Sequence, residues 1–482
     1  MSDLVTLTID GREVQVPPGT MVLEAAKLAG VLVPHYCYHP SLPVAGVCRM
    51  CLVEVAGSAK LAAACATPVA PGMAVSVSGA QAKAARQGVL EFLLINHPLD
   101  CPVCDQAGEC ELQDYTFQEG RSGTRYGSFA KRYNPVEDFG PDVLYVPNRC
   151  ILCTRCVRFM EHVAEAPVLN VSERGDRAYI GIDAGHKLEH PWSGNVVDLC
   201  PVGSLISKDF LHKARAWDLD KTASVCTGCT QGCSVTLETR DNMVVRVRPR
   251  PNPEVNRHFI CDRGRLDYHW MNRSDRIETP LVRKDGRLAA VSWEEALGQM
   301  ADLLRSAKAP WVGLVSPGVS SEALEGAARL LALGKGTGAF RVPQGEEAPL
   351  AGVPDLALRA DRAPNVQGAE AAGFDRDWPG AVARTRSAGL VVVLGEALDG
   401  VEAPAAGVPV LYIGTALPEA ARGAAVVLPC ASVAEEEGSF VNLRGRRQPY
   451  YQAKAAPGMA RPAAWILEEV LAMLGAGAGV AA

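Results

Sequence analysis

The chain has 482 residues, which exceeds the roughly 100 to 200 residues of one typical domain, so we expect about three or four domains. Its formal net charge of −6 argues against a nucleic-acid partner, because phosphate binding requires clustered Lys and Arg, which no stretch supplies. No signal peptide is visible and no apolar run reaches the roughly 20 residues that span a bilayer, so we expect a cytoplasmic protein that meets a membrane only through partners.

Cysteine is the most informative residue type, because 15 of the 16 cysteines and one histidine fall by spacing into four sets of four potential metal ligands. In a reducing compartment disulfides are rare, and C-x-x-C pairs indicate metal or redox chemistry, with a disulfide framework as the alternative. The sets are Cys37, Cys48, Cys51 and Cys65 (set A); His97, Cys101, Cys104 and Cys110 (set B); Cys150, Cys153, Cys156 and Cys200 (set C); and Cys226, Cys229, Cys233 and Cys261 (set D).

The N-terminal residues predict the start of a β-grasp domain. Residues 4–9 alternate with the period of a strand, Asp10-Gly11 predicts a hairpin turn, and residues 13–16 can pair back. Thr20 is expected to cap a helix that runs to about Leu28, and Gly30 follows as a stop signal.

Set A follows this helix, with a short strand at residues 52–55 before its last cysteine. It resembles the plant-type [2Fe-2S] ferredoxins, in which four thiolates hold two irons, but ten residues instead of four separate its first two cysteines. This departure points to a respiratory-complex relative of the ferredoxins. A structural zinc site is the alternative.

Set B begins where a predicted helix over residues 81–96 ends at His97-Pro98. Pro98, Pro102 and Gly108 supply bends between its closely spaced ligands. We expect a [4Fe-4S] cluster with His97 as one ligand. Zinc held by three cysteines and one histidine, or a His97 that is not a ligand, are the alternatives. A neutral imidazole in place of a thiolate should favour the reduced cluster.

Set C opens with the spacing of a bacterial ferredoxin, but Met160 stands where the fourth cysteine is expected, and the Cys-Pro pair comes later, at Cys200-Pro201. One triplet with one distant Cys-Pro predicts a single [4Fe-4S] cluster. Arg155 and Arg158 lie beside the ligands and can lower the cost of the cluster's negative charge.

Set D resembles the [4Fe-4S] domain that begins the molybdopterin-dependent oxidoreductases. Residues 235–238 and 243–247 predict a hairpin between its triplet and Cys261. Further along, Ser292 and Glu295 have the spacing of a capping box that opens a helix.

The residues after 275 alternate helical patterns with short apolar strands at 311–315, 390–394 and 408–413, which predicts an α/β domain. Residues 334–338 are glycine-rich but lack a phosphate-loop motif, so we expect a loop without a nucleotide. Cys430 is expected to be a buried small hydrophobe. Roughly 200 residues are too few for a molybdenum ligand and two pterin sites.

In their spacing and order, the four sets closely resemble the family of the large iron-sulfur subunit of NADH-quinone oxidoreductase, respiratory complex I. The resemblance implies one [2Fe-2S] cluster on set A, [4Fe-4S] clusters on sets B, C and D, no molybdopterin and no catalytic residue in this chain. It implies a partner subunit that binds NADH and flavin, and an electron route through sets A, C and B to a neighbouring subunit, with set D off the route. It also implies a peripheral position on the cytoplasmic side of the inner membrane, within a proton-translocating complex.

The implied fold class is multidomain, α+β followed by α/β. The expected domains are a β-grasp [2Fe-2S] ferredoxin-like domain (1–78), a His-plus-three-Cys [4Fe-4S] segment (79–120), a ferredoxin-like [4Fe-4S] segment (140–215), a molybdopterin-oxidoreductase-type [4Fe-4S] domain (219–274) and a shortened molybdopterin-oxidoreductase-like α/β domain without an active site (275–482).

Two other functions are compatible with parts of the pattern. One is the electron-transfer subunit of a soluble NAD-linked formate dehydrogenase or hydrogenase; those relatives generally carry a two-cluster ferredoxin segment, so Met160 counts against this interpretation. The other is a zinc-stabilised scaffold without a redox role, which iron content and colour would exclude.

Overall fold

The structure is a computed structural model that describes residues 4–128, 130–398, 400, 403–404 and 407–475. The chain forms two compact units, one of Met1–Asp218 with Leu350–Pro354 and one of Leu219–Pro349 with Asp355–Ala482. Sets A, B and C lie in the first unit, and set D and Cys430 lie in the second.

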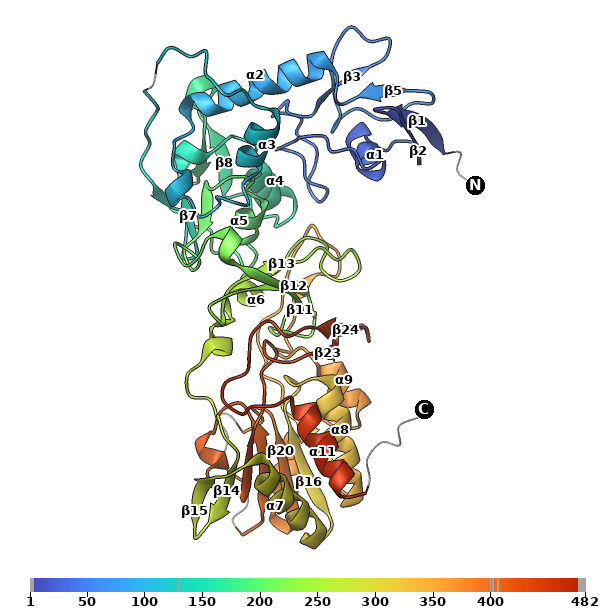
Figure 1. Ribbon diagram of the computed structural model, residues 1–482, viewed down its shortest axis with the longest axis vertical. Coiled ribbons are helices and arrows are strands. Elements are labelled where there is room, and N and C mark those ends of the chain that lie inside the picture. Colours follow the sequence, from blue (N-terminus) through green and yellow to red (C-terminus); the bar gives the residue numbers. More distant parts are fainter. Residues whose placement is uncertain (1–3, 129, 399, 401–402, 405–406, 476–482) are drawn as a thin grey trace. The chain divides into compact units, whose positions relative to one another are not determined.

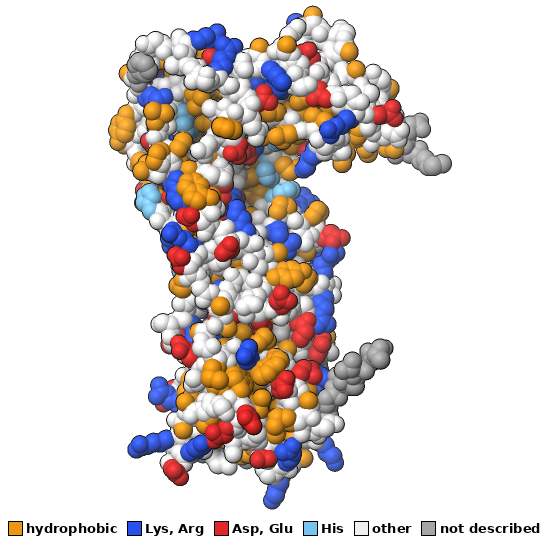
Figure 2. Space-filling view, viewed as in Figure 1, with side chains coloured by type: hydrophobic (Ala, Val, Ile, Leu, Met, Phe, Trp, Pro, Cys, Tyr) orange, Lys and Arg blue, Asp and Glu red, His pale blue; other side chains and the backbone are white. Residues whose placement is uncertain are grey.

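Among the described residues, no helix is long and apolar enough to cross a membrane. Acidic and basic side chains are interspersed on the face of each unit that Figure 2 shows.

The first unit begins with a five-stranded sheet in the order β2-β1-β5-β3-β4. Its strands are β1 (Val5–Ile9), β2 (Arg12–Val16), β3 (Leu52–Val55), β4 (Ala62–Ala63) and β5 (Ala74–Ser76), and helix α1 (Val22–Leu28) packs its apolar residues into the core beside them. The predicted hairpin is confirmed: β1 and β2 are antiparallel, and Asp10 and Gly11 both have positive φ, as a tight two-residue turn requires. Strand β5 runs parallel to β1.

The prediction that Thr20 caps α1 is wrong. Met21 is the N-cap and makes no side-chain capping bond, while the Thr20 hydroxyl donates to the carbonyl of Pro17 at 2.8 Å. The helix instead gains its stability from the burial of one apolar face.

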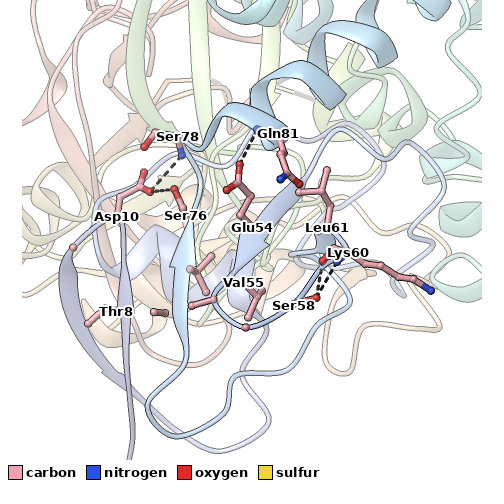
Figure 3. A pocket seen from close by; sticks show the side chains of 15 residues that line it. Thr8, Asp10, Glu54, Val55, Ser58, Lys60, Leu61, Ser76, Ser78 and Gln81 are labelled. Atoms are coloured by element: carbon pink, nitrogen blue, oxygen red, sulfur yellow. Dashed lines mark hydrogen bonds between the residues drawn. The ribbon is translucent and has the colours of Figure 1, made fainter.

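Helix α2 (Ala80–Asn96) connects the β-grasp sheet to set B and ends directly before His97 (Figure 1). Its N-cap, Gly79, has no side chain, and Glu54 from β3 accepts hydrogen bonds from the backbone N–H groups of Gln81 at 2.8 Å and Ala82 at 3.1 Å instead (Figure 3). Arg86, 1% exposed, pairs with Glu119 at 3.1 Å. These contacts fix the helix, and with it the position of His97.

The rest of the first unit consists of short elements around sets B and C. The helical elements are η1 (Cys101–Val103), α3 (Glu111–Glu119), η2 (Pro147–Arg149), α4 (Arg155–His162), η3 (Gly175–Arg177), α5 (Asn195–Leu199) and η4 (Ala216–Asp218). Strands β6 (Glu137–Asp138), β7 (Val143–Tyr145) and β10 (Leu205–Ser207) form one sheet, and β8 (Leu169–Ser172) and β9 (Tyr179–Ile182) form a hairpin.

The second unit begins with a three-stranded antiparallel sheet of β11 (Asp220–Val225), β12 (Ser234–Arg240) and β13 (Met243–Pro249), followed by α6 (Asp262–Leu266) and η5 (His269–Asn272). The predicted hairpin between the triplet of set D and Cys261 is therefore confirmed. Asp241 and Asn242 at its turn both have positive φ.

The remainder of the second unit contains a seven-stranded sheet in the order β15-β14-β22-β21-β20-β16-β17. Its strands are β14 (Leu281–Lys284), β15 (Arg287–Ala290), β16 (Trp311–Val315), β17 (Thr337–Phe340), β20 (Leu390–Leu394), β21 (Val410–Gly414) and β22 (Val426–Pro429). Strands β16, β17, β20, β21 and β22 run parallel to one another, in the order of a doubly wound α/β fold. Strands β14 and β15 add an antiparallel edge.

Helices cover both faces of this sheet. Helices α7 (Trp293–Ser306), α8 (Ser321–Leu333) and α11 (Ala463–Met473) pack on one face (Figure 1), where alternate residues of β20, such as Val392, join their core. The other residues of β20, such as Val393, form a second core to which α10 (Trp378–Arg384) contributes, and η6 (Thr385–Ser387) follows that helix in the chain. The remaining elements are α9 (Val366–Ala371), η7 (Glu419–Ala421), the pair β18 (Ala348–Pro349) with β19 (Ala357–Leu358) and the pair β23 (Gly438–Val441) with β24 (Arg447–Tyr450).

Two local predictions in this domain need correction. The glycine-rich segment is not a loop throughout, because Thr337 and Gly338 begin strand β17, which pairs with β16. The capping box of α7 is formed only in part: Ser292 accepts from the N–H of Glu295 at 3.2 Å, but the Glu295 carboxylate pairs with Lys284 at 2.5 Å. Cys430 is 2% exposed within the core under α7, α8 and α11, as expected for a small hydrophobe.

A buried carboxyl group makes the stability of the second unit depend on pH. Glu436 is 6% exposed and accepts a hydrogen bond from the Tyr450 hydroxyl at 2.7 Å, and its Oε2 has no partner among the described residues. Burial raises the pKa of Glu436 from 4.5 to about 7. The folded state therefore favours the protonated acid, and this contribution is present below about pH 4.5 and lost as the pH rises through about 7.

We expect Glu436→Gln to remove this dependence. In the unsubstituted chain, ionisation of Glu436 should lower the free energy of unfolding by about 3 kcal/mol as the pH rises from 4.5 to 8, since each pKa unit corresponds to about 1.4 kcal/mol. Hydrogen exchange of strands β23 and β24 at pH 5 and pH 8 measures the effect. Protection that falls equally with pH in both proteins would contradict the assignment to Glu436.

Candidate metal centres

Set A is gathered at one end of the β-grasp sheet. The Sγ atoms of Cys51 and Cys65 lie 3.4 Å apart. Hydrogen bonds from the thiols of Cys48 and then Cys65 hold the pKa of Cys37 well below its usual value, so this thiol lies against two others of the set. The loop between Cys37 and Cys48 turns at Gly46, which has φ of 64°. All four predicted ligands of set A are therefore brought together.

Set B lies at the end of helix α2. The Nδ1 atom of His97 is buried and has no hydrogen-bond partner among the described residues. Burial, with further contributions from Lys131 and Arg149, lowers the pKa of His97 to about 4, so its imidazole is neutral at pH 7 and keeps a lone pair for a metal.

The three cysteines of set B are near one another. Burial, with smaller contributions from Cys104 and Cys101, raises the pKa of Cys110 to about 11. A cavity of about 580 Å³ is lined by His97, Cys101 and Cys110. Cys101 is exposed, while Cys104 and Cys110 are buried. An unpartnered imidazole nitrogen and thiols around one cavity are a donor set that fits a metal cluster.

Set C surrounds the start of helix α4. Leu152 and Thr154 have φ of 53° and 60°, so the chain turns sharply between its thiols, and the Leu152 N–H donates to Cys150 Sγ at 3.4 Å. Burial, with a contribution from the nearby Cys200, raises the pKa of Cys150 to about 11. Burial and the charges of the other three thiols also hold the pKa of Cys156 well above its usual value.

Set D, in the second unit, likewise has backbone N–H groups that donate to its sulfur atoms and a thiol whose pKa is raised by burial. The N–H of Gly228 donates to Cys226 Sγ, and the N–H of Gly264 donates to Cys261 Sγ, both at 3.4 Å. A Cβ at Gly264 would lie 2.8 Å from Cys226 Sγ, so only glycine allows this approach. Burial, followed by the charge of Cys229, raises the pKa of Cys261 to about 12.

Sets B, C and D thus place several thiols in an environment that disfavours free thiolates, whereas in set A hydrogen bonds from Cys48 and Cys65 favour the thiolate of Cys37. Thiolates are nevertheless the form that binds metal, and bound cations would remove the cost of grouping them. Among the described residues, no group of three or more His, Cys, Asp or Glu side chains is arranged to hold a single metal ion. The ligands of an iron-sulfur cluster bind different iron atoms, so they surround the cluster instead of converging on one point.

The three sets of the first unit are connected by direct contacts that the sequence does not reveal. The Glu111 N–H, next to Cys110 of set B, donates to the carbonyl of Pro201, next to Cys200 of set C, at 3.0 Å. Arg155 pairs with the Glu111 carboxylate at 2.9 Å and donates to the carbonyl of Leu199 at 3.3 Å.

One hydrophobic cluster also includes a thiol from each of these three sets, namely Cys37, Cys110 and Cys153. Tyr36 and Tyr115 lie in the same cluster, with ring centroids 5.4 Å apart. The space between the three sets is therefore filled by apolar and aromatic side chains. No sequence signal had pointed to Tyr36 or Glu111 as neighbours of the ligands.

A cavity of about 660 Å³ on the β-grasp domain has no cysteine among its lining residues (Figure 3). Its lining includes two carboxylates: Asp10 accepts from the Val77 N–H at 2.8 Å, and Glu54 caps helix α2. These carboxylates already have partners within the fold, so their placement is explained by structure alone.

Family models match five segments of the chain. They are described as a 2Fe-2S iron-sulfur cluster binding domain (2–79), the NADH-ubiquinone oxidoreductase-G iron-sulfur binding region (86–125), the ferredoxin-like domain of NADH-quinone oxidoreductase subunit 3 (140–206), the molybdopterin oxidoreductase Fe4S4 domain (219–273) and molybdopterin oxidoreductase (399–473). The predicted multidomain layout is confirmed at this level.

Similar curated proteins include the G subunit of the NADH-quinone oxidoreductase of Rickettsia bellii, 42% identical over 63% of this chain and 44% of the relative. The mitochondrial NADH-ubiquinone oxidoreductase 78 kDa subunit of Neurospora crassa is 45% identical over 62% of this chain and 40% of the relative. The chain thus spans less than half the length of these two relatives. The predicted resemblance to the large iron-sulfur subunit of NADH-quinone oxidoreductase is confirmed over the matched residues.

Among solved structures, a chain in the crystal structure of NAD+-reducing [NiFe]-hydrogenase in the H2-reduced state is 32% identical, with a TM-score of 0.40. The match covers 44% of this chain and 90% of that chain.

Proposed function

We propose that this chain is an iron-sulfur electron-transfer subunit of a proton-translocating NADH-quinone oxidoreductase. The observation that carries the proposal is the arrangement of 15 cysteines and His97 as four local groups, in a chain that resembles the large iron-sulfur subunit of that complex. We assign a [2Fe-2S] cluster to set A and [4Fe-4S] clusters to sets B, C and D, without molybdopterin.

When bound, such clusters supply one-electron carriers, and the protein determines their potentials through ligand type, hydrogen bonds and burial. Backbone N–H groups such as that of Leu152 donate to the sulfur atoms, which orients the ligands and favours the thiolate form. Apolar side chains exclude water from the space between Cys37, Cys110 and Cys153. No general acid, base or nucleophile is required of this chain.

We propose that electrons enter at set A, from a partner subunit that binds NADH and flavin, and leave from set B toward a neighbouring subunit, with set C between. The contacts of Glu111 with Pro201 and of Arg155 with Leu199 support adjacency of sets B and C. The subunit would attach to the cytoplasmic side of the inner membrane through its partners.

We place set D off this route and propose that the α/β domain, which resembles the molybdopterin oxidoreductases, has no active site. In doubly wound sheets, ligands bind in the crevice at the carboxyl ends of the strands where the order reverses, here β16 and β20. In this chain, a Cβ at Gly395, just after β20, would lie 2.8 Å from Val319 and 2.9 Å from Ser316. Because Val319 and Ser316 approach Gly395 this closely, they leave little room for a ligand beside Gly395, which supports the proposal that the domain has no active site.

The test is NADH-driven reduction of the chain assembled with its partner subunits under anaerobic conditions. We expect NADH to produce EPR signals of a reduced [2Fe-2S] cluster and of [4Fe-4S] clusters that also form with dithionite. Clusters that dithionite reduces but NADH leaves oxidised would contradict the proposed place of this chain after the NADH-oxidising subunit.

A further inference from the structure

Arg158 joins the loops of sets A and C through a single guanidinium group. Its Nη2 donates to the carbonyl of Cys37 at 2.5 Å and to the carbonyl of Cys153 at 3.2 Å. Its Nη1 donates to the carbonyl of Pro43 in the set A loop, and its Nε donates to the Thr154 hydroxyl in the set C loop at 3.2 Å. The two loops are more than 100 residues apart in sequence, and the fork shape of the guanidinium suits this bridging role.

Arg158 also differs in charge compensation from the other buried arginines of the first unit. Arg86, Arg149 and Arg155 each pair with a carboxylate, from Glu119, Asp100 and Glu111 respectively. Arg158 is 8% exposed, and among the described residues all its hydrogen-bond acceptors are neutral carbonyl or hydroxyl oxygens. Burial of a cation without a counter-charge is costly.

Negative charge that would offset this cost belongs to the two ligand sets that Arg158 touches. Clusters held by four thiolates are anionic and become more negative on reduction. A fixed cation between two such sites would stabilise the reduced form of each.

Resting on the proposed function, we propose that Arg158 is a positioning residue that links the centres of sets A and C. It holds their loops at a fixed separation and raises the reduction potentials of both centres together. The guanidinium forms no bond to a metal and transfers no electron.

The test compares Arg158→Gln and Arg158→Lys in the full chain, with Arg177→Gln as the matched control. Arg177 is an exposed arginine in the same unit, so its replacement removes the same charge from a solvated position. Anaerobic EPR redox titration follows each centre separately, and set D, in the other unit, serves as an internal reference.

For Arg158→Gln, we expect the reduction equilibria of sets A and C to shift about tenfold toward the oxidised form, which corresponds to about 59 mV for a one-electron couple. Set D should not shift. Arg158→Lys keeps the charge and should shift less, and Arg177→Gln should leave all potentials unchanged.

The proposal is overturned if sets A and C shift no more in Arg158→Gln than in Arg177→Gln, or if set D shifts equally. It is also overturned if Arg158→Gln and Arg158→Lys both lose the iron of sets A and C to the same extent, since the role would then be one of shape alone. In each of these cases the unsubstituted chain still contains its clusters. Their absence from the unsubstituted chain would instead contradict the proposed function.

Discussion

Cys156→Ala is expected to remove the [4Fe-4S] cluster of set C and to interrupt electron flow through the first unit. Cys156 is 7% exposed in the first turn of α4, and the charges of Cys153, Cys150 and Cys200 all act on it. Three remaining thiols leave one iron without a protein ligand. Iron content should fall from about fourteen to about ten atoms per chain, and NADH-driven reduction of set B should fall by more than about 100-fold.

Two matched cysteine variants separate the possible causes of such a loss. Cys430→Ala removes a buried thiol outside the four sets and should leave iron content unchanged. Cys233→Ala, in set D, should lower iron content by about four atoms but leave the reduction of set B by NADH intact. Equal losses of set B reduction in Cys156→Ala and Cys233→Ala would contradict the placement of set D off the route.

His97→Cys is expected to keep the cluster of set B but lower its potential. The imidazole is buried, its Nδ1 lacks a partner among the described residues, and burial keeps it neutral at pH 7. A thiolate at this position would add one negative charge beside the cluster and disfavour reduction. By comparison with the histidine-ligated Rieske centres, the potential should fall by on the order of 100 mV, with iron content unchanged.

The control for His97 is His186→Cys, since His186 lies in the same unit and its side chain is exposed. This variant should leave the set B potential where it is. An EPR titration in which His97→Cys retains its iron and shows the same potential as the unsubstituted chain would remove His97 from the set of ligands.

Local sequence signals predicted the parts of the fold that depend on neighbouring residues. Asp10-Gly11 predicted the first hairpin because its positive-φ turn is a property of two residues. His97-Pro98 predicted the end of helix α2 because proline disfavours helical conformation in the residue before it. The cysteine triplets of sets C and D followed from short spacings of the same kind, whereas Cys200 and Cys261 lie far along the chain from their triplets and are assigned from the resemblance to known cluster domains.

The remaining features depend on contacts between distant residues, which no local signal reports. Glu54 caps helix α2 from a strand 27 residues earlier, and Arg158 reaches Cys37 over 121 residues. The Thr20 prediction failed because the hydroxyl bonds backward to Pro17. The loop prediction at residues 334–338 failed because pairing with β16 outweighs the weak strand preference of Gly338.

Anaerobic metal analysis combined with EPR of the full chain tests most directly whether the four sets hold iron-sulfur clusters. We predict a brown protein with about fourteen iron atoms, from one [2Fe-2S] and three [4Fe-4S] clusters, and EPR signals of both cluster types after reduction. A colourless protein with about four zinc ions and no iron would contradict this assignment.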